Sequence, residues 1–278
     1  MLRFTLIMKL IAIQGKTASF HDIAAKQFFG DVQTTNYDLP FKNVFEGLKN
    51  ADYAVVAIEN SLYGSINEVY DLLLEYMYPI VGEIYLRIEH CLIACQAVDI
   101  QTITEVHSHP IALAQCEEYL DSELKNAERY EHFDTAGSVE SVKTWAKPNV
   151  AAIASEDAAQ LHNMHILAKN IETNKENYTR FVVLSKKTQE LTDISKASLI
   201  IKTADKPGAL HEALGYFAKH KLNLSKLESR PIVGKAWHYM FYIDVESKEL
   251  ADKLPLVINL LQKAGCDVQL LGSYVKTS

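Results

Sequence analysis

Four short polar clusters in the first 185 residues have residue types that could bind an anion. They are residues 15–19 (GKTAS), 60–64 (NSLYG), 108–110 (SHP) and 134–138 (DTAGS). Each is expected where a strand ends and a helix begins, and a helix N-terminus offers unpaired N–H groups with a partial positive charge. A capped helix is the simpler explanation of any single cluster. Four clusters at strand ends, where α/β proteins bind ligands, favour a small anionic ligand.

Other kinds of site are not supported by the residue spacing. The GKT string at 15–17 resembles half of a phosphate-binding loop, but Leu10 stands where the upstream glycine is required. No GxGxxG fingerprint is present, which argues against a nicotinamide cofactor. The histidines at 107 and 109, and those at 162 and 165, have no third ligand in a metal-binding pattern. Surface or capping positions therefore explain them better than a zinc site.

The overall charge argues against nucleic acid as a partner. The chain has 28 Lys and Arg against 35 Asp and Glu, a net charge of −7, whereas phosphate contacts need clustered positive charge. An anionic ligand must therefore be held by local donors against the field of the whole protein.

The cysteines and the apolar segments predict a cytoplasmic protein. The four cysteines form no CxxC pair, and Cys91 and Cys95 are expected in the core. Lys9 interrupts the apolar start, no cleavage site of small residues follows, and residues 1–7 are interpreted as an extension. No stretch reaches about 18 uninterrupted apolar residues, so no membrane span is expected.

The first 185 residues alternate between strand and helix patterns, which predicts α/β sheets. Ser19 with Asp22 resembles a capping box, and Ser108 followed by Pro110 is a favourable helix start. The expected strands are 9–14, 53–59, one ending at 105–107, 150–154 and 181–185. The expected helices are 20–29, 66–76, 110–120 and one from 155 to about 162.

The remainder of the chain predicts a polar linker and a second, smaller domain. Residues 186–196 (KKTQELTDISK) form the linker. Strands are expected at 197–203, 223–232, 237–245 and 266–275, and helices at 207–220 and 249–264, the second one broken or kinked at Pro255. This β-α-β-β-α-β order is ferredoxin-like.

Five strings resemble one enzyme family. SHPIALAQC (108–116), AIENSLYGSI (57–66) and NYTRFVVL (177–184) are similar to motifs of prephenate dehydratases. PGALHEAL (207–214) and LESRP (227–231) resemble the two phenylalanine-binding motifs of the ACT regulatory domain attached to these enzymes. The resemblance runs from about residue 9 to the C-terminus, with all motifs in the family's order.

The chain departs from the family pattern in two places. The first loop matches the usual Gly-Pro-x-Gly-Thr-Phe pattern only at Gly15, Ser19 and Phe20, because Lys16 and Ala18 replace the proline and the second glycine. Ser19 retains a hydroxyl where the family has threonine. The second departure is His211, which follows GAL where valine is common and could alter the effector pocket.

The resemblance implies a two-lobed catalytic region at 8–185, like a periplasmic solute-binding protein, and an ACT domain at 197–278 after the linker. It implies a homodimer formed through the ACT domains, often extended to a homotetramer. It implies prephenate as substrate, L-phenylalanine as allosteric effector, and neither a metal nor an organic cofactor.

The resemblance also implies roles for individual residues. Thr179 would hydrogen-bond the departing ring hydroxyl of prephenate, because a threonine hydroxyl is too weak an acid to give up its proton unaided. The implied substrate-binding residues are Ser19, Asn60, Ser61, Ser108 and Gln115. Arg180 could pair with a substrate carboxylate or belong to a structural ion pair, and Glu59 could supply a proton or be structural.

The implied effector site lies in the ACT domain. Its residues are Gly208, Ala209, Leu210, Asn223, Leu224, Glu228, Ser229, Arg230 and Pro231. Backbone N–H groups at the start of the 207–220 helix could take the carboxylate of phenylalanine, and Leu210 with Leu224 could form an apolar wall for its ring.

Two other functions remain open on the sequence. Arogenate dehydratase acts on a substrate with an amino group in place of the side-chain keto group, and no residue distinguishes the two substrates. A non-catalytic small-molecule sensor could share the fold, but a pure binder has no need of the threonine in NYTRF beside the other polar groups.

Overall fold

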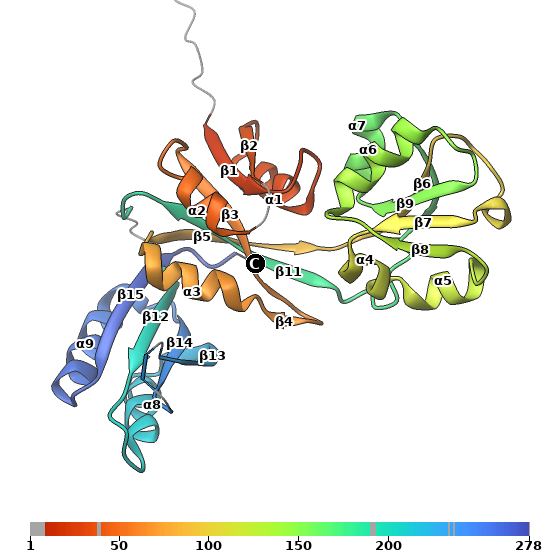
Figure 1. The fold of residues 1–278 in the computed structure, drawn as a ribbon. Helices are drawn as coiled ribbons and strands as arrows, with labels where there is room; N and C mark the ends of the chain where they lie inside the picture. Colours follow the sequence, from red (N-terminus) through yellow and green to blue (C-terminus); the bar gives the residue numbers. More distant parts are fainter. Residues whose placement is uncertain (1–8, 38–39, 190–192, 233, 236, 278) are drawn as a thin grey trace, which may run out of the picture. The chain divides into compact units, whose positions relative to one another are not determined.

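The computed structural model describes residues 9–37, 40–189, 193–232, 234–235 and 237–277 (Figure 1). The predicted extension at 1–7, the predicted start of the catalytic region at Met8, and residues 190–192 of the predicted linker lie outside this described part. Two compact units divide the chain. One comprises 1–72 and 84–181, and the other 73–83 and 182–278.

The first sheet is built around two buried parallel strands. β1 (Leu10–Gln14) lies between β2 (Gln33–Tyr37) and β3 (Tyr53–Asn60), and pairs parallel with both. The order continues through β11 (Tyr178–Ser185) to β5 (Ile80–Arg87), while β4 (Gly64–Ser65) pairs antiparallel with β3. The centres of β1 and β3 read as unbroken apolar runs, as expected for strands covered on both faces.

Helices alternate with the strands of this sheet. α1 (Phe20–Phe29) begins after Ser19 and ends at Gly30, as predicted, and Gly30 has a positive φ of 77°. α2 (Lys42–Gly47) and α3 (Asn67–Tyr76) follow along the chain.

The second sheet has the order β10-β6-β9-β7-β8. Its strands are β6 (Cys91–Ala94), β7 (Glu105–Ser108), β8 (Glu128–Glu131), β9 (Val150–Ala154) and β10 (His165–Lys169). β7 is parallel to β8 and β9, whereas β6 is antiparallel to β9 and β10. The chain therefore passes from the first sheet to the second between β5 and β6, and returns between β10 and β11.

Helices cover both faces of the second sheet, as the alternation of side chains on β9 shows. Ala152 and Ala154 pack with α6 (Thr135–Trp145) and α7 (Glu156–His162) in one core. Ala151 and Ile153 pack in another core with α4 (Pro110–Gln115) and α5 (Glu117–Glu123). A short 3-10 helix, η1 (Ile100–Thr102), precedes β7. Two sheets joined by two crossings confirm the predicted two-lobed α/β region.

The C-terminal sheet has the predicted ferredoxin-like order. β12 (Lys196–Lys202), β13 (Asn223–Pro231), β14 (Tyr239–Glu246) and β15 (Asp267–Tyr274) form an antiparallel sheet of order β13-β14-β12-β15. The helices are α8 (Ala209–Lys219) and α9 (Leu250–Lys263). Their apolar residues join those of the strands in one core, with Phe217 and Leu261 fully buried.

The first half of β5 belongs to the same compact unit as this sheet. A Cβ added at Gly272 of β15 would meet the backbone oxygen of Ile80 at 2.0 Å, so only glycine fits there. Beside this contact, the ammonium of Lys196 lies 2.9 Å from the carboxylate of Glu83, and both side chains are fully buried.

Several expectations differ from the structure. Cys95, expected in the core, is only partly buried, and His107, expected at the surface or in a cap, is buried. The predicted helix 110–120 is two helices, because the chain leaves helical geometry at Cys116. The expected break at Pro255 does not occur, and α9 is continuous through it. Asn60 does not open a helix: its side chain caps a turn into the β3–β4 hairpin. The last strand of the predicted catalytic region begins at Tyr178 and therefore includes Thr179.

Candidate active site

Three polar side chains from two neighbouring strands of the first sheet form one cluster. Asn60 ends β3, Thr179 lies near the start of β11, and Asn177 precedes β11. The amide nitrogen of Asn60 donates to Oγ1 of Thr179 at 3.0 Å and to Oδ1 of Asn177 at 2.8 Å. Asn177 and Thr179 are buried.

The orientation of the Asn60 amide is fixed from its other end. Its Oδ1 accepts the backbone N–H groups of Leu62 and Tyr63 at 3.0 and 3.1 Å. Its NH₂ group must therefore face Thr179 and Asn177. Because Thr179 accepts from Asn60, the hydrogen of its own hydroxyl is not used in this bond and can point to a ligand.

Ser61 holds the two strand ends together. Its hydroxyl donates to the carbonyl of Glu176 at 2.8 Å and accepts the N–H of Tyr178 at 2.9 Å. Its backbone N–H donates to the carbonyl of Tyr178 at 2.8 Å. These three bonds fix Thr179 next to Asn60.

Arg180 and Glu59 lie near each other on the same pair of strands. Their charged atoms are 4.0 Å apart, with Arg180 almost fully buried and Glu59 about one-third exposed. The guanidinium also lies 6.0 Å from the ring centre of Tyr85, within range of a cation–π contact. This arrangement agrees better with the structural ion pair than with a guanidinium extended toward a ligand.

A second polar cluster surrounds Gln115 at the end of α4. Its Oε1 lies 2.7 Å from Nε2 of His90, a residue in the crossing between β5 and β6. The backbone N–H of His90 donates to the buried carboxylate of Glu172, in the other crossing, at 3.0 Å. The ring of Phe20, the first residue of α1, meets the His90 ring edge-on at 5.5 Å. Burial lowers the pKa of His90, while Gln115 and Glu172 partly oppose this shift.

Ser108 is fully buried, and its hydroxyl donates to the carbonyl of Ile153 on the adjacent strand at 2.6 Å. The N-cap of α4 is the next residue, His109, whose ring accepts the N–H of Ile111 at 3.2 Å. Ser108 thus ties β7 to β9.

The first loop is held by hydrogen bonds of its own around the start of α1. Ser19 caps α1, accepting weakly from the N–H of Asp22 at 3.4 Å, while the carboxylate of Asp22 reaches back to the N–H of Ala18 at 2.8 Å. Ala18, at the place of the second glycine, has a positive φ of 66°. Ala18 also accepts a hydrogen bond from Ser155 at 2.8 Å, and Lys16 forms an ion pair with Glu140.

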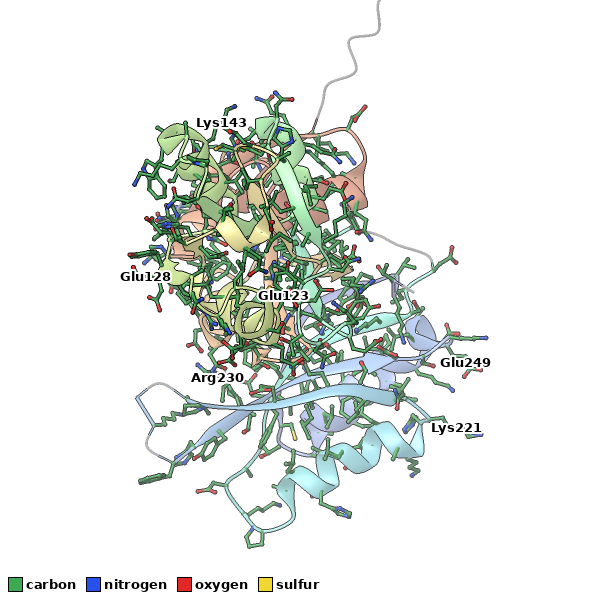
Figure 2. All side chains as sticks on the ribbon, turned by 90° about the vertical axis from the view of Figure 1, so that its right-hand side faces the viewer. Glu123, Glu128, Lys143, Lys221, Arg230 and Glu249 are labelled. Atoms are coloured by element: carbon green, nitrogen blue, oxygen red, sulfur yellow. The ribbon has the colours of Figure 1, made fainter. Side chains whose placement is uncertain are left out.

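The predicted effector residues occupy two elements of the ACT-like sheet. Gly208, with a φ of 82°, directly precedes α8, whose first turn contains Ala209 and Leu210. The other predicted residues lie on β13, an edge strand, where Figure 2 labels Arg230. Side chains along β13 alternate between exposed and half-buried.

A cavity of about 230 Å³ lies beside the crossing segments, but it is not formed by the predicted site residues. Its wall includes Phe20, Arg87, Glu89, Glu156 and Lys169. Opposite charges therefore face it, which gives a dianion no clear advantage. No group of three His, Cys, Asp or Glu side chains that could hold a metal occurs within the described residues. In the same part of the chain, no helix is both long and apolar enough to span a membrane.

The structure thus joins Asn60, Ser61 and Thr179 in one network, pairs Glu59 with Arg180 separately, and places Gln115 in another network. Two residues of these networks were not predicted. Asn177 belongs to the NYTRF string and could have been found there. His90 carries no motif, and only its contact with Gln115 indicates a role.

The chain is similar to known proteins over most of its length. The prephenate dehydratase family profile matches residues 11–189, and the ACT domain profile matches residues 197–254. A bifunctional chorismate mutase/prephenate dehydratase of Enterobacter agglomerans is 36% identical over 95% of this chain and 70% of the relative. Arogenate dehydratase/prephenate dehydratase 2 of Arabidopsis thaliana is 34% identical over 95% of this chain and 72% of the relative.

The fold of this chain matches solved structures over nearly its whole length. A prephenate dehydratase from Arthrobacter aurescens in complex with L-Phe matches with a TM-score of 0.85 and 28% identity, covering 96% of this chain and 90% of that one. GqqA, described as a novel type of quorum quenching acylase, matches with a TM-score of 0.86 and 30% identity, covering 97% and 98%.

The protein is a two-lobed α/β enzyme with a C-terminal ACT domain. The chain belongs to the prephenate dehydratase family.

Proposed function

We propose that this chain converts prephenate to phenylpyruvate, with loss of water and carbon dioxide, in L-phenylalanine biosynthesis. The observation that carries the proposal is the direction of the hydrogen bond between Asn60 and Thr179. Because Thr179 accepts from a fixed amide, its hydroxyl hydrogen is directed away from Asn60 and is available to a leaving group.

The reaction breaks two bonds of prephenate. The carbon–carbon bond to the ring carboxylate breaks, carbon dioxide leaves, and the electron pair enters the ring as the carbon–oxygen bond to the ring hydroxyl breaks. The hydroxyl departs as water after taking up one proton, which solvent supplies in the overall balance. Aromatisation drives the reaction, so the protein has to orient the dianion and stabilise negative charge on the departing oxygen. Thr179 donates its hydrogen bond to that oxygen.

The other residues divide into two groups. Gln115, Ser19 and the first turn of α1 offer donors for the carboxylates of the substrate. Asn60 and Ser61 act through Thr179, because their described hydrogen bonds fix the position of β11. Ser108 stabilises the pairing of β7 with β9, and the Arg180–Glu59 ion pair stabilises the pairing of β11 with β3.

Arogenate is the competing substrate, and the Arabidopsis relative is named for both activities. The two substrates differ only in the side chain, which carries an amino group in arogenate and a keto group in prephenate. Measuring kcat/KM for both substrates, with phenylpyruvate and phenylalanine as the respective products, tests the proposal. A higher value for prephenate supports it, and a higher value for arogenate replaces it with the arogenate reaction.

The acylase name of GqqA raises a different reaction on the same fold. No feature of the clusters described above favours amide hydrolysis over loss of a hydroxyl. An assay for quorum-quenching acylase activity discriminates the two reactions. A non-catalytic sensor would turn over neither substrate class.

Regulation by L-phenylalanine completes the proposal. The Arthrobacter structure is a complex with L-Phe, and the present chain has the Gly208 turn and the 227–231 strand where the family motif lies. We place the effector between these elements, in a homodimer or homotetramer formed through the ACT domains. The catalytic region is taken as 8–185, the linker as 186–196 and the regulatory domain as 197–278. A reducing cytoplasm suits the four free cysteines.

A further inference from the structure

His90 is a buried histidine with a single side-chain hydrogen bond. The residue is 1% exposed, and its ring packs edge-on against that of Phe20, with the ring centroids 5.5 Å apart. Nε2 lies 2.7 Å from Oε1 of Gln115. Nδ1 is also buried, and the described residues offer it no hydrogen-bond partner.

The chemistry of the two groups sets the direction of their bond. Oε1 of Gln115 can only accept, so Nε2 of His90 must carry the hydrogen. Nδ1 is then a bare acceptor inside the protein, which costs free energy comparable with a lost hydrogen bond. A phenylalanine would fill similar space, keep the ring contact with Phe20 and remove this cost. Packing alone therefore does not account for a histidine at this position.

The hydrogen bond to Gln115 does account for a histidine at this position. A glutamine amide has an accepting end and a donating end of nearly the same shape, so an unrestrained amide can present either one. A dianion is attracted to the NH₂ end and repelled by the oxygen. With its oxygen held by His90, Gln115 has only its NH₂ end left to present to a ligand.

We propose that His90 is a positioning residue that fixes the amide of Gln115 so that its NH₂ group faces the anionic substrate. This inference rests on the proposed dehydratase function, in which Gln115 binds a substrate carboxylate. Burial also lowers the pKa of His90. The ring therefore stays neutral near pH 7, as a single N–H donor to Gln115 requires.

The backbone around His90 keeps the ring in place. Its N–H group donates to Glu172 in the second crossing segment at 3.0 Å. Ile88, two residues earlier, donates to the carbonyl of Asn177 at 2.7 Å, and Asn177 in turn accepts from Asn60. One crossing thus carries His90, which contacts Gln115, and the other carries Asn177, which contacts Asn60.

Steady-state kinetics on prephenate with the full-length protein tests this inference. His90→Phe should raise KM roughly tenfold, the effect of losing one hydrogen bond to a charged group, and change kcat less. Its melting temperature should equal or exceed that of the wild type, since the orphaned nitrogen is gone. His90→Gln, which restores an N–H donor of similar reach, should recover most of the affinity.

A double-mutant cycle separates positioning from a general structural effect. In a Gln115→Ala background, His90→Phe should raise KM no further. An unchanged KM in His90→Phe alone, or the same added rise in both backgrounds, would overturn the inference. Imidazole ¹⁵N resonances provide a readout independent of activity: a neutral ring protonated at Nε2 agrees with it, and protonation at Nδ1 contradicts it. If the wild type does not turn over prephenate, the proposed function fails instead.

Discussion

The hydroxyl of Thr179 has one hydrogen to donate, and its neighbours decide where that hydrogen goes. Asn60 donates to the oxygen at 3.0 Å, and its own orientation is fixed by two backbone N–H groups. A short polar residue at the end of one strand thereby controls the chemistry of a residue on the next. The IENS and NYTRF strings each supply one partner of this bond.

Ser108 gives a prediction in which stability and substrate binding separate. Its buried hydroxyl donates to the carbonyl of Ile153 at 2.6 Å. Ser108→Ala leaves that carbonyl without this donor, so we expect a loss of about 1 kcal/mol or more in the free energy of unfolding, with little change in KM for prephenate. Urea unfolding and steady-state kinetics measure both quantities. A raised KM with unchanged stability would show instead that Ser108 binds the substrate directly.

His21 predicts a pH dependence of stability. Burial lowers its pKa from 6.5 to about 3, and its ring accepts the N–H of Ala57 at 3.2 Å. Below pH 6.5 the unfolded chain takes up a proton that the folded protein cannot, so this contribution to stability is full above pH 6.5 and falls toward pH 3. The expected slope is about 1.4 kcal/mol per pH unit.

Urea unfolding of the wild type and His21→Phe, from pH 7.5 to 5, measures this contribution. The variant should lose less stability per pH unit than the wild type, whatever its stability at pH 7.5. Parallel curves for the two proteins would show that His21 is not the group responsible.

At the scale of elements, the sequence predicts β1, β3, β7, β9 and β11 of the first two sheets, but misses β2, β4, β8 and β10 as well as β5 and β6. Residues 80–94 run as IVGEIYLRIEHCLIA, with no turn signal between the two strands and a charged residue inside the first. Glu83 is tolerated in a buried strand because Lys196, 113 residues later, supplies the opposite charge. No local pattern contains that information. For the same reason His90, whose partner comes from α4, could not be recognised.

The Lys196–Glu83 pair predicts a large loss of stability when one partner is removed. The side chains are 1% and 0% exposed and 2.9 Å apart. Lys196→Met should cost about 3–5 kcal/mol, because it leaves a buried carboxylate without its main counter-charge. Replacing both residues, in Lys196→Met/Glu83→Leu, should recover most of this loss. Denaturant unfolding gives both values.

An exposed ion pair of the same sheet provides the matched control. Lys202 and Asp267 are also 2.9 Å apart, but they are one-third and two-thirds exposed. Asp267→Asn should cost less than about 1 kcal/mol. If Lys196→Met were no worse than Asp267→Asn, the buried pair would not hold β5 to the C-terminal sheet as described.

At the scale of the whole molecule, β5 and β11 each run from one compact unit into the other. β11 carries Thr179 at one end and Ser185 at the other. Removing residues 197–278 would remove Gly272, which packs directly against Ile80 of β5. A truncated chain would therefore lose stability, and this loss could not be separated from a loss of regulation. Point substitutions in the full chain are the better test.

Gly208 allows such a test of regulation. Its φ is 82°, a conformation that side chains rarely adopt, and it precedes the helix whose N–H groups would hold the phenylalanine carboxylate. We expect Gly208→Val to abolish L-phenylalanine binding in calorimetry while basal turnover of prephenate is retained. Gly265→Val is the matched control, because Gly265 has a φ of 86° and equally open surroundings. It should bind phenylalanine normally, and loss of binding in both variants would indicate general damage to the domain.

Turnover of prephenate by the wild type, Thr179→Val and Thr179→Ser tests the central claim most directly. Valine matches threonine in shape but has no hydroxyl, so we expect kcat to fall by about 10²-fold or more, the loss typical of one positioned transition-state donor. Serine keeps the hydroxyl bonded to Asn60 and should retain most of the activity, with melting temperatures close to the wild type in both. Near wild-type kcat in Thr179→Val would contradict the assignment of the departing hydroxyl to Thr179.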